Sequence, residues 1–216
     1  MQAHSSKLLK KDLFGQVRLE TRESGPVIVR DTVEAPSWTR WLARRLLARE
    51  ARALAALTGV DGVPQIVAVN RDSLERSWID GQPMQVGKPA DLRYFHHAAR
   101  LLRHMHRAGV VHNDLAKEPN LLVTVDGTPA MIDFQLAWYA PSRGRLFRLL
   151  GREDIRHLLK HKRTYCPAAL TARERRILET PSLPSRLWMQ TGKRAYLFVT
   201  RRILGWADRE GAGDRF

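Results

Sequence analysis

Cysteine is nearly absent from this sequence, whose 216 residues include one thiol, Cys166. A single cysteine excludes a disulfide framework within the chain and a zinc site built on thiolates. No run of about 18 apolar residues occurs, so no membrane-spanning helix is expected. The first residues, 1–7, lack the apolar segment that a signal peptide requires. These absences together predict a cytoplasmic protein.

Acidic residues are also scarce: 22 Asp and Glu face 37 Lys and Arg, which leaves a net charge of +15. Most of the excess is arginine, whose planar guanidinium suits contacts with phosphate. One interpretation is an anionic partner, such as a phosphorylated lipid or saccharide, a membrane surface, or RNA. The other is that a GC-rich genome supplies arginine as the default solubilising residue. Composition leaves both interpretations open.

The chain is long enough for one compact unit of two lobes. Its apolar fraction of 44% is sufficient for a folded core. A helix, a loop and a hairpin are predicted in succession between residues 101 and 135. The helical pattern ends at Gly109, and the hairpin consists of strands at 121–125 and 129–132 with a two-residue turn at Asp126-Gly127.

Three polar side chains occupy the ends of these elements: Asp114 in the loop, Asn120 at its close, and Asp133 after the returning strand. Phosphoryl transfer from ATP requires such a set. One Asp orients the attacking hydroxyl and takes its proton, while an Asn and a second Asp hold the magnesium ions that screen the phosphates. The alternative interpretation is that Asp114 is a turn residue and Asp133 a strand-end cap.

The order and spacing of this segment resemble the catalytic loop and metal-binding motif of protein-kinase-like enzymes. The resemblance implies ATP and Mg²⁺ as cofactors, Asp114 as the catalytic base, and Asn120 and Asp133 as metal ligands. It also implies that Lys117 reaches the transferred phosphate and that His112 is a scaffold residue. The motif departs from the usual pattern because Asn120 lies six residues after Asp114 instead of five, and Gln135 replaces a glycine.

The N-terminal third contains weaker parts of the same resemblance. Strands are predicted at 8–20 and 26–30, and Gly15 and Val17 look like the end of a glycine-rich loop over the ATP phosphates. Two expected glycines are replaced by Lys10 and Asp12.

Arg30 stands where a strand lysine would contact the ATP phosphates. A helix is predicted over 38–57, and its Glu50 would pair with Arg30. The other interpretation of Glu50 is a solvated helix charge. The predicted apolar face of this helix comprises Trp38, Trp41, Leu42, Leu46, Ala53, Leu54 and Leu57.

Strands are predicted at 66–69 and 77–79, followed by a hinge at 80–84 whose Asp80 would lie at the adenine site. A long helix is predicted over 92–107. Its four histidines have no i, i+4 spacing, so a metal site there is not expected.

Three further helices are predicted, at 154–161, 172–179 and 193–207. The last is basic and amphipathic, and it is interpreted either as packing on the core or as lying on a membrane surface. Its basic residues and interfacial aromatic are Lys193, Arg194, Arg201, Arg202 and Trp206.

We therefore predict an α+β, two-lobed protein-kinase-like fold. A small β-rich N-lobe with the hinge would span 1–84, and a reduced, mainly helical C-lobe would span 85–216. The resemblance covers residues 8–160 and is closest to bacterial lipopolysaccharide core (Kdo/heptose) kinases, then to RIO kinases.

This resemblance implies an ATP-dependent kinase acting on a hydroxyl, with a lipid-linked saccharide as the first expectation for the acceptor. Peripheral contact with an anionic membrane is expected with it. The alternatives are an atypical, RIO-like serine/threonine protein kinase, a pseudokinase that binds partners, and an RNA-associated RIO-like ATPase.

Overall fold

The computed structural model describes residues 5–180. The chain forms two compact units, with the boundary between Thr171 and Ala172. The described part of the second unit contains one helix, α5 (Ala172–Glu179), which lies where the sequence predicts it. The predicted helix at 193–207, with its basic pairs, lies outside the described residues.

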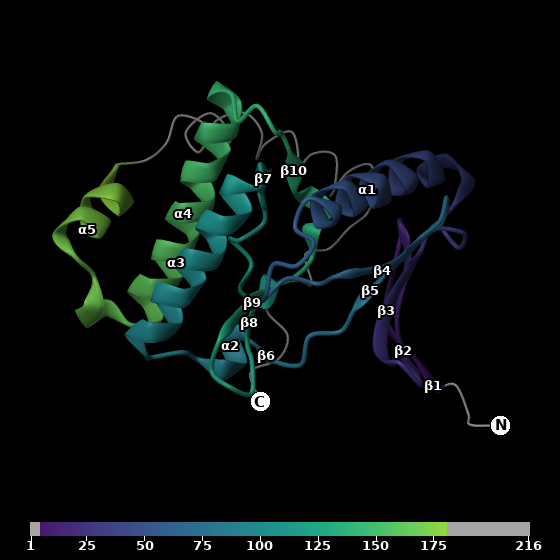
Figure 1. Ribbon diagram of the computed structural model, residues 1–216, viewed down its shortest axis with the longest axis horizontal. Coiled ribbons are helices and arrows are strands. Elements are labelled where there is room, and N and C mark those ends of the chain that lie inside the picture. The colour runs from purple at the N-terminus through teal and green to yellow at the C-terminus, as the bar shows by residue number, and fades with distance from the viewer. Residues whose placement is uncertain (1–4, 181–216) are drawn as a thin grey trace, which may run out of the picture. The chain divides into compact units, whose positions relative to one another are not determined.

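An antiparallel sheet of five strands begins the first unit, in the order β1-β2-β3-β5-β4 (Figure 1). Its strands are β1 (Ser5–Asp12), β2 (Gly15–Arg22), β3 (Gly25–Asp31), β4 (Ile66–Val69) and β5 (Ser73–Ser77). The single strand predicted at 8–20 is wrong, because β1 and β2 form a hairpin. The backbone reverses after Asp12, whose side chain accepts a hydrogen bond from the Phe14 amide at 2.8 Å.

Helix α1 (Ser37–Ala55) forms as predicted, but the face assigned to its first half is wrong. Trp38 and Trp41 are 61% and 62% exposed, whereas Thr39 and Glu50 are buried. The Thr39 hydroxyl donates to the Leu13 carbonyl at 2.7 Å, and Glu50 pairs with arginines of the sheet. These polar contacts set the rotation of the helix, which apolar periodicity alone assigned differently.

The predicted strand at 77–79 is displaced, because β5 instead ends at Ser77 and pairs along β3. The predicted hinge contains β6 (Gln82–Pro83) and the short helix α2 (Met84–Gly87). β6 pairs with β8 (Leu121–Val123), and β8 pairs with β9 (Pro129–Met131).

The β8–β9 hairpin has a three-residue loop instead of the predicted two-residue turn. Thr124 and Thr128 face each other across it, with a 2.9 Å hydrogen bond from the Thr124 amide to the Thr128 carbonyl. Gly127 adopts the positive φ of +71° that commonly closes such a loop.

Two long helices, α3 (Leu92–Arg107) and α4 (Arg145–Tyr165), pack against each other in the second half of the unit (Figure 1). α3 has its predicted bounds, whereas α4 begins nine residues before the predicted 154–161 segment. Short elements complete the unit: β7 (Val110–Val111), β10 (Trp138–Tyr139), and the 3-10 turns η1 (Glu118–Asn120), η2 (Phe134–Leu136) and η3 (Pro167–Ala169).

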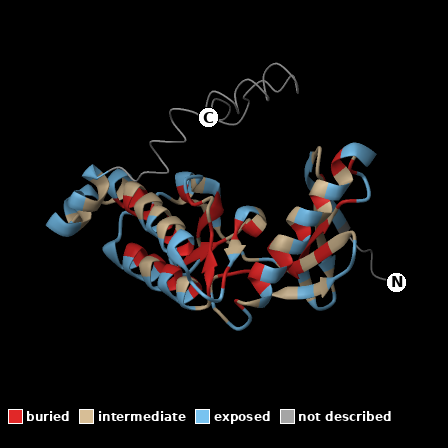
Figure 2. Cartoon of the chain, turned by 90° about the horizontal axis from the view of Figure 1, so that it is seen from above, coloured by how far each residue is buried: buried red, intermediate tan, exposed pale blue. Residues whose placement is uncertain are grey.

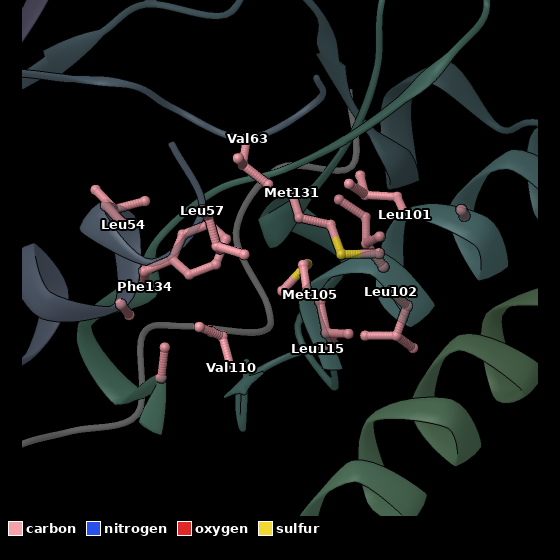
Figure 3. Close-up of a cluster of buried hydrophobic side chains, with 14 of the residues drawn as sticks. Leu54, Leu57, Val63, Leu101, Leu102, Met105, Val110, Leu115, Met131 and Phe134 are labelled. Carbon is pink, nitrogen blue, oxygen red and sulfur yellow. The ribbon is translucent and has the colours of Figure 1, made fainter. Parts of the chain in front are cut away.

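Both helices are buried on one side and exposed on the other, as Figure 2 shows. The main apolar core draws its side chains from α1, α3, the catalytic segment and the β8–β9 hairpin (Figure 3). Leu54 and Leu57 contribute from the C-terminal end of α1, Met105 from α3, and Phe134 from the segment that follows Asp133. Because one core includes residues from both lobes, the two lobes are packed together.

No helix within residues 5–180 is long and apolar enough to cross a membrane.

Candidate active site

The catalytic loop holds Asp114 by side-chain contacts on its C-terminal side. The Asn120 amide nitrogen donates to the Asp114 backbone carbonyl at 2.9 Å and to the Asp114 carboxylate at 3.0 Å. Lys117 Nζ lies 3.2 Å from the same carboxylate oxygen. The η1 turn accommodates the extra residue of this loop. In it the backbone N–H of Asn120 donates to the Lys117 carbonyl at 3.2 Å. The structure therefore brings Asp114, Lys117 and Asn120 together.

His112 is fully buried and joins the catalytic loop to the strand that leads to Asp133. Its Nδ1 accepts from the Asp114 amide at 3.3 Å, and its Nε2 lies 3.0 Å from the Ile132 carbonyl. These partners require Nε2 to carry the proton and Nδ1 to be the acceptor. Burial lowers the pKa of His112, so the neutral ring that this arrangement needs is favoured.

Asp154 on α4 anchors the same loop and was missed by the sequence analysis. Its carboxylate is fully buried and accepts backbone N–H groups from His112 at 2.8 Å and Asn113 at 2.9 Å. Asn113 adopts a left-handed φ of +63°, which asparagine tolerates better than most residues other than glycine. An acidic residue within a basic helical segment was the available signal, but its partners His112 and Asn113 lie more than 40 residues away in sequence.

Asp133 has the features of a metal ligand. Its backbone is left-handed, with φ +64°, and its Oδ1 is buried without a hydrogen-bond partner among the described residues. A buried carboxylate oxygen without a partner is costly unless a cation or donor arrives. Asn120 has its amide nitrogen committed to Asp114, which leaves its carbonyl oxygen for a ligand role. Oxygen donors of this kind, few in number, suit Mg²⁺, because phosphates and water complete its shell.

The segment after Asp133 is fixed against α1. Phe134 is fully buried beside Leu54 and Leu57 (Figure 3). Its ring contacts the His112 ring in a tilted arrangement, with 4.8 Å between the ring centroids. Arg49 donates to the carbonyls of Leu136 at 2.8 Å and Ala137 at 2.5 Å. The segment that follows Asp133 and the helix that bears Glu50 are therefore held in one arrangement.

The Arg30–Glu50 pair is present and buried, with 3.4 Å between guanidinium and carboxylate. Glu50 is therefore not a solvated helix charge. A second arginine, Arg76 of β5, binds the other carboxylate oxygen of Glu50 more closely. Burial lowers the pKa of Arg30, and it lowers the pKa of Arg76 to about 10, while the nearby Asp133 acts in the opposite direction on both. Both guanidinium groups stay charged at neutral pH.

Arg76 was not predicted, although the alternation of β5 contained the signal. Leu74 and Arg76 are the two buried residues of this strand, so Arg76 shares the sheet face that meets α1. Arg30, Arg76 and Glu50 form a buried trio. Its two guanidinium groups and one carboxylate leave one positive charge in excess. Asp133 lies close enough to interact with both arginines.

The remaining predicted cofactor residues occupy less decisive positions. Val17 pairs with Arg30 across β2 and β3. Gly15 has φ +117°, and a Cβ there would lie 2.0 Å from the Asp31 carbonyl oxygen. Close packing of two strands thus explains this glycine without any phosphate. Asp80 is exposed, and no contact within residues 5–180 places it beside the other site residues. A role for these three in nucleotide binding stays a prediction.

The site combines Asp114, whose carboxylate is held by Asn120, with Asp133, whose Oδ1 has no partner among the described residues. Its third part is a buried strand cation, Arg30, paired with the Glu50 carboxylate of α1. Together with the two-lobed fold, these parts define a protein-kinase-like phosphotransferase domain. The model of the RIO domain family matches residues 20–174.

This match covers well over half of the chain, which therefore belongs to the RIO domain family of atypical ATP-dependent kinases. The matched range includes all the site residues except Gly15 and Val17. No curated protein matches the chain.

Proposed function

We propose that this protein is an atypical protein kinase that transfers the γ-phosphate of ATP to a hydroxyl group of a protein. The arrangement of Asp114, Asn120 and Asp133 within a RIO domain supports this proposal. The comparisons lend no support to the lipopolysaccharide-core acceptor that was the first expectation. The RIO-like alternative fits the family match better.

Each site residue has a role that follows from its contacts. Asp114 orients the acceptor hydroxyl and accepts its proton, and its carboxylate is held in place by Asn120 and Lys117. Magnesium, when bound by Asp133 and Asn120, would neutralise charge on the nucleotide phosphates. Lys117 is 54% exposed at its side chain, so its ammonium can leave Asp114 and follow the phosphoryl group.

The cluster of Arg30, Arg76 and Glu50 favours an active enzyme over a pseudokinase. Arg30 lies on β3, beside the β1–β2 hairpin that lacks the expected glycines. It is charged and buried, and it is paired with Glu50 of α1. The second cation, Arg76, supplies Glu50 with a close partner of its own. Arg30 therefore keeps hydrogen-bonding capacity for an anion, and its Nε has no partner among the described residues.

Transfer from radiolabelled ATP to separated pools tests this proposal. Purified protein is incubated with Mg²⁺ and a protein, a lipid or a saccharide fraction, beside Asp114→Asn as the matched inactive control. We expect label in protein hydroxyls with the wild type and none with the variant. Label confined to lipid or saccharide would overturn the protein acceptor and restore the earlier expectation. Nucleotide binding without transfer to any pool would identify a pseudokinase.

A further inference from the structure

A pocket lies between α3, α4 and the connection before α4, and Asp114, Asn120 and Asp133 are not among the residues that line it. Its volume is about 570 Å³. Five arginines line it, two from α3, one from the connection and two from α4, and His106 also contributes to its wall. These residues are Arg103, Arg107, Arg143, Arg148, Arg152 and His106.

The charge of this pocket is not balanced by its own walls. All five arginines are exposed, and none of their guanidinium groups makes an ion pair or a hydrogen bond within residues 5–180. No carboxylate from the described part of the chain lines the pocket. Clustered guanidinium groups repel one another, and a concave cationic surface concentrates anions. The arginines converge from three segments on one hollow, which differs from the extended stripe that tracks a nucleic-acid backbone.

The pocket is connected to the catalytic loop through two residues. His106 borders it and lies 3.2 Å, Nε2 to carboxylate, from Asp154. Asp154 in turn accepts the amides of His112 and Asn113, next to Asp114 in sequence. The His106 ring is confined on its other sides by Phe147, at 6.0 Å between ring centroids, and by Gly151. An anion that reorients His106 would therefore change the field at the carboxylate that holds the catalytic loop.

We propose that this pocket binds a compact ligand carrying two or more phosphate groups, and that its occupancy alters the order of the catalytic loop. Arginine pairs bidentately with phosphate oxygens, and five guanidinium groups exceed what one phosphate can satisfy. The volume accommodates a small oligophosphate or a phosphorylated headgroup. The binding site is independent of the kinase activity, whereas the regulatory half rests on the proposed function.

Calorimetric titration with sodium tripolyphosphate tests the binding site. The test variant is Arg107→Glu/Arg152→Glu, with one change on each helix of the pocket. The control is Arg100→Glu/Arg163→Glu, which reverses two exposed arginines of the same helices outside the pocket. We expect affinity at least about 100-fold weaker in the test variant, since each charged contact contributes about 10-fold or more, and little change in the control. Equal affinity in all three proteins would overturn the site.

Two further arms identify the source of the phosphates. Vesicles containing phosphorylated inositol lipid are compared with the soluble inositol phosphate headgroup and with tripolyphosphate. Retention on these vesicles but no binding of soluble ligand would assign the site to a lipid headgroup. A single-stranded RNA that outcompetes tripolyphosphate, in a manner lost only in the test variant, would overturn the compact ligand in favour of nucleic acid.

Hydrogen exchange at the amides of His112 and Asn113 tests the coupling without relying on catalysis. We expect tripolyphosphate to change their protection in the wild type and the control, but not in Arg107→Glu/Arg152→Glu. Selective binding with unchanged exchange would overturn the regulatory half. Selective binding with changed exchange in a protein that transfers no phosphate would leave this inference standing and refute the proposed function instead.

Discussion

Replacing Glu50 by Gln removes the one carboxylate that two buried arginines share. The Arg30–Glu50 separation of 3.4 Å corresponds to an attraction of about 5 kcal/mol at an effective dielectric constant of about 20. Removing one partner of a buried pair typically costs about 3–5 kcal/mol, because the other charge is left uncompensated. We therefore expect Glu50→Gln to lower the free energy of unfolding by about 3–5 kcal/mol, a large part of the stability of an ordinary domain.

Arg76→Met should cost less than Glu50→Gln, although both break the closest contact of the trio. It removes a buried cation whose charge is in excess and leaves Glu50 paired with Arg30. In the double variant the excess cation disappears together with the carboxylate. We expect the double variant to lose less stability than the two single losses added, with a coupling of about 1–3 kcal/mol.

Urea denaturation of the four proteins measures these differences. Glu34→Gln is the matched control, since its carboxylate is half exposed and pairs only loosely with Lys11 at 3.7 Å. We expect that control to lie within about 0.5 kcal/mol of the wild type. Additive losses for the Glu50 and Arg76 variants, or a Glu50→Gln loss no larger than that of the control, would refute the charge argument.

Arg30→Met should also raise the ATP concentration that transfer requires more than Arg76→Met does. The reverse order would exchange the roles of the two arginines.

Three other outcomes are expected. Asp133→Asn should abolish the magnesium-dependent part of nucleotide affinity in calorimetry while the melting temperature stays within a few degrees, and unchanged Mg-ATP affinity would exclude the metal role. Asp114→Ala should slow transfer by roughly 10²–10⁴-fold with nucleotide affinity retained, and near-normal transfer would make Asp114 a turn residue. Burial lowers the pKa of His112 and of His157 below 6.5, so their stability contribution is complete above pH 6.5 and lost as pH falls through the lowered values. Urea midpoints should fall on acidification, less steeply in His157→Gln, and a flat profile would contradict both shifts.

The catalytic segment could be predicted from sequence because its elements are local. The bounds of α3 and the β8–β9 pairing, which flank Asp114, Asn120 and Asp133 in the sequence, follow from short-range patterns. Helical periodicity, strand alternation and turn residues report such short-range preferences directly. The Arg30–Glu50 pair was also predicted, although it joins two elements, because the kinase resemblance supplied the long-range connection.

The rotation of α1 was decided by tertiary structure. Trp38 and Trp41 are large apolar residues, and helical periodicity predicts that they are buried. The structure instead buries Thr39 and Glu50, because a carbonyl from the β1–β2 turn and two sheet arginines are the partners available to that face. A helix presents several possible faces, and the choice among them depends on the surface that it meets.

The remaining features depend on pairs far apart in the chain. Asp154 anchors the catalytic loop from α4, Arg76 reaches Glu50 from β5, and the arginine-lined pocket draws on α3 and α4 together. Residue patterns alone were enough to predict a kinase-like chemistry and the sign of the net charge. Which charges are buried in pairs and which stay exposed depends on the tertiary fold, because burial and pairing arise when distant segments pack.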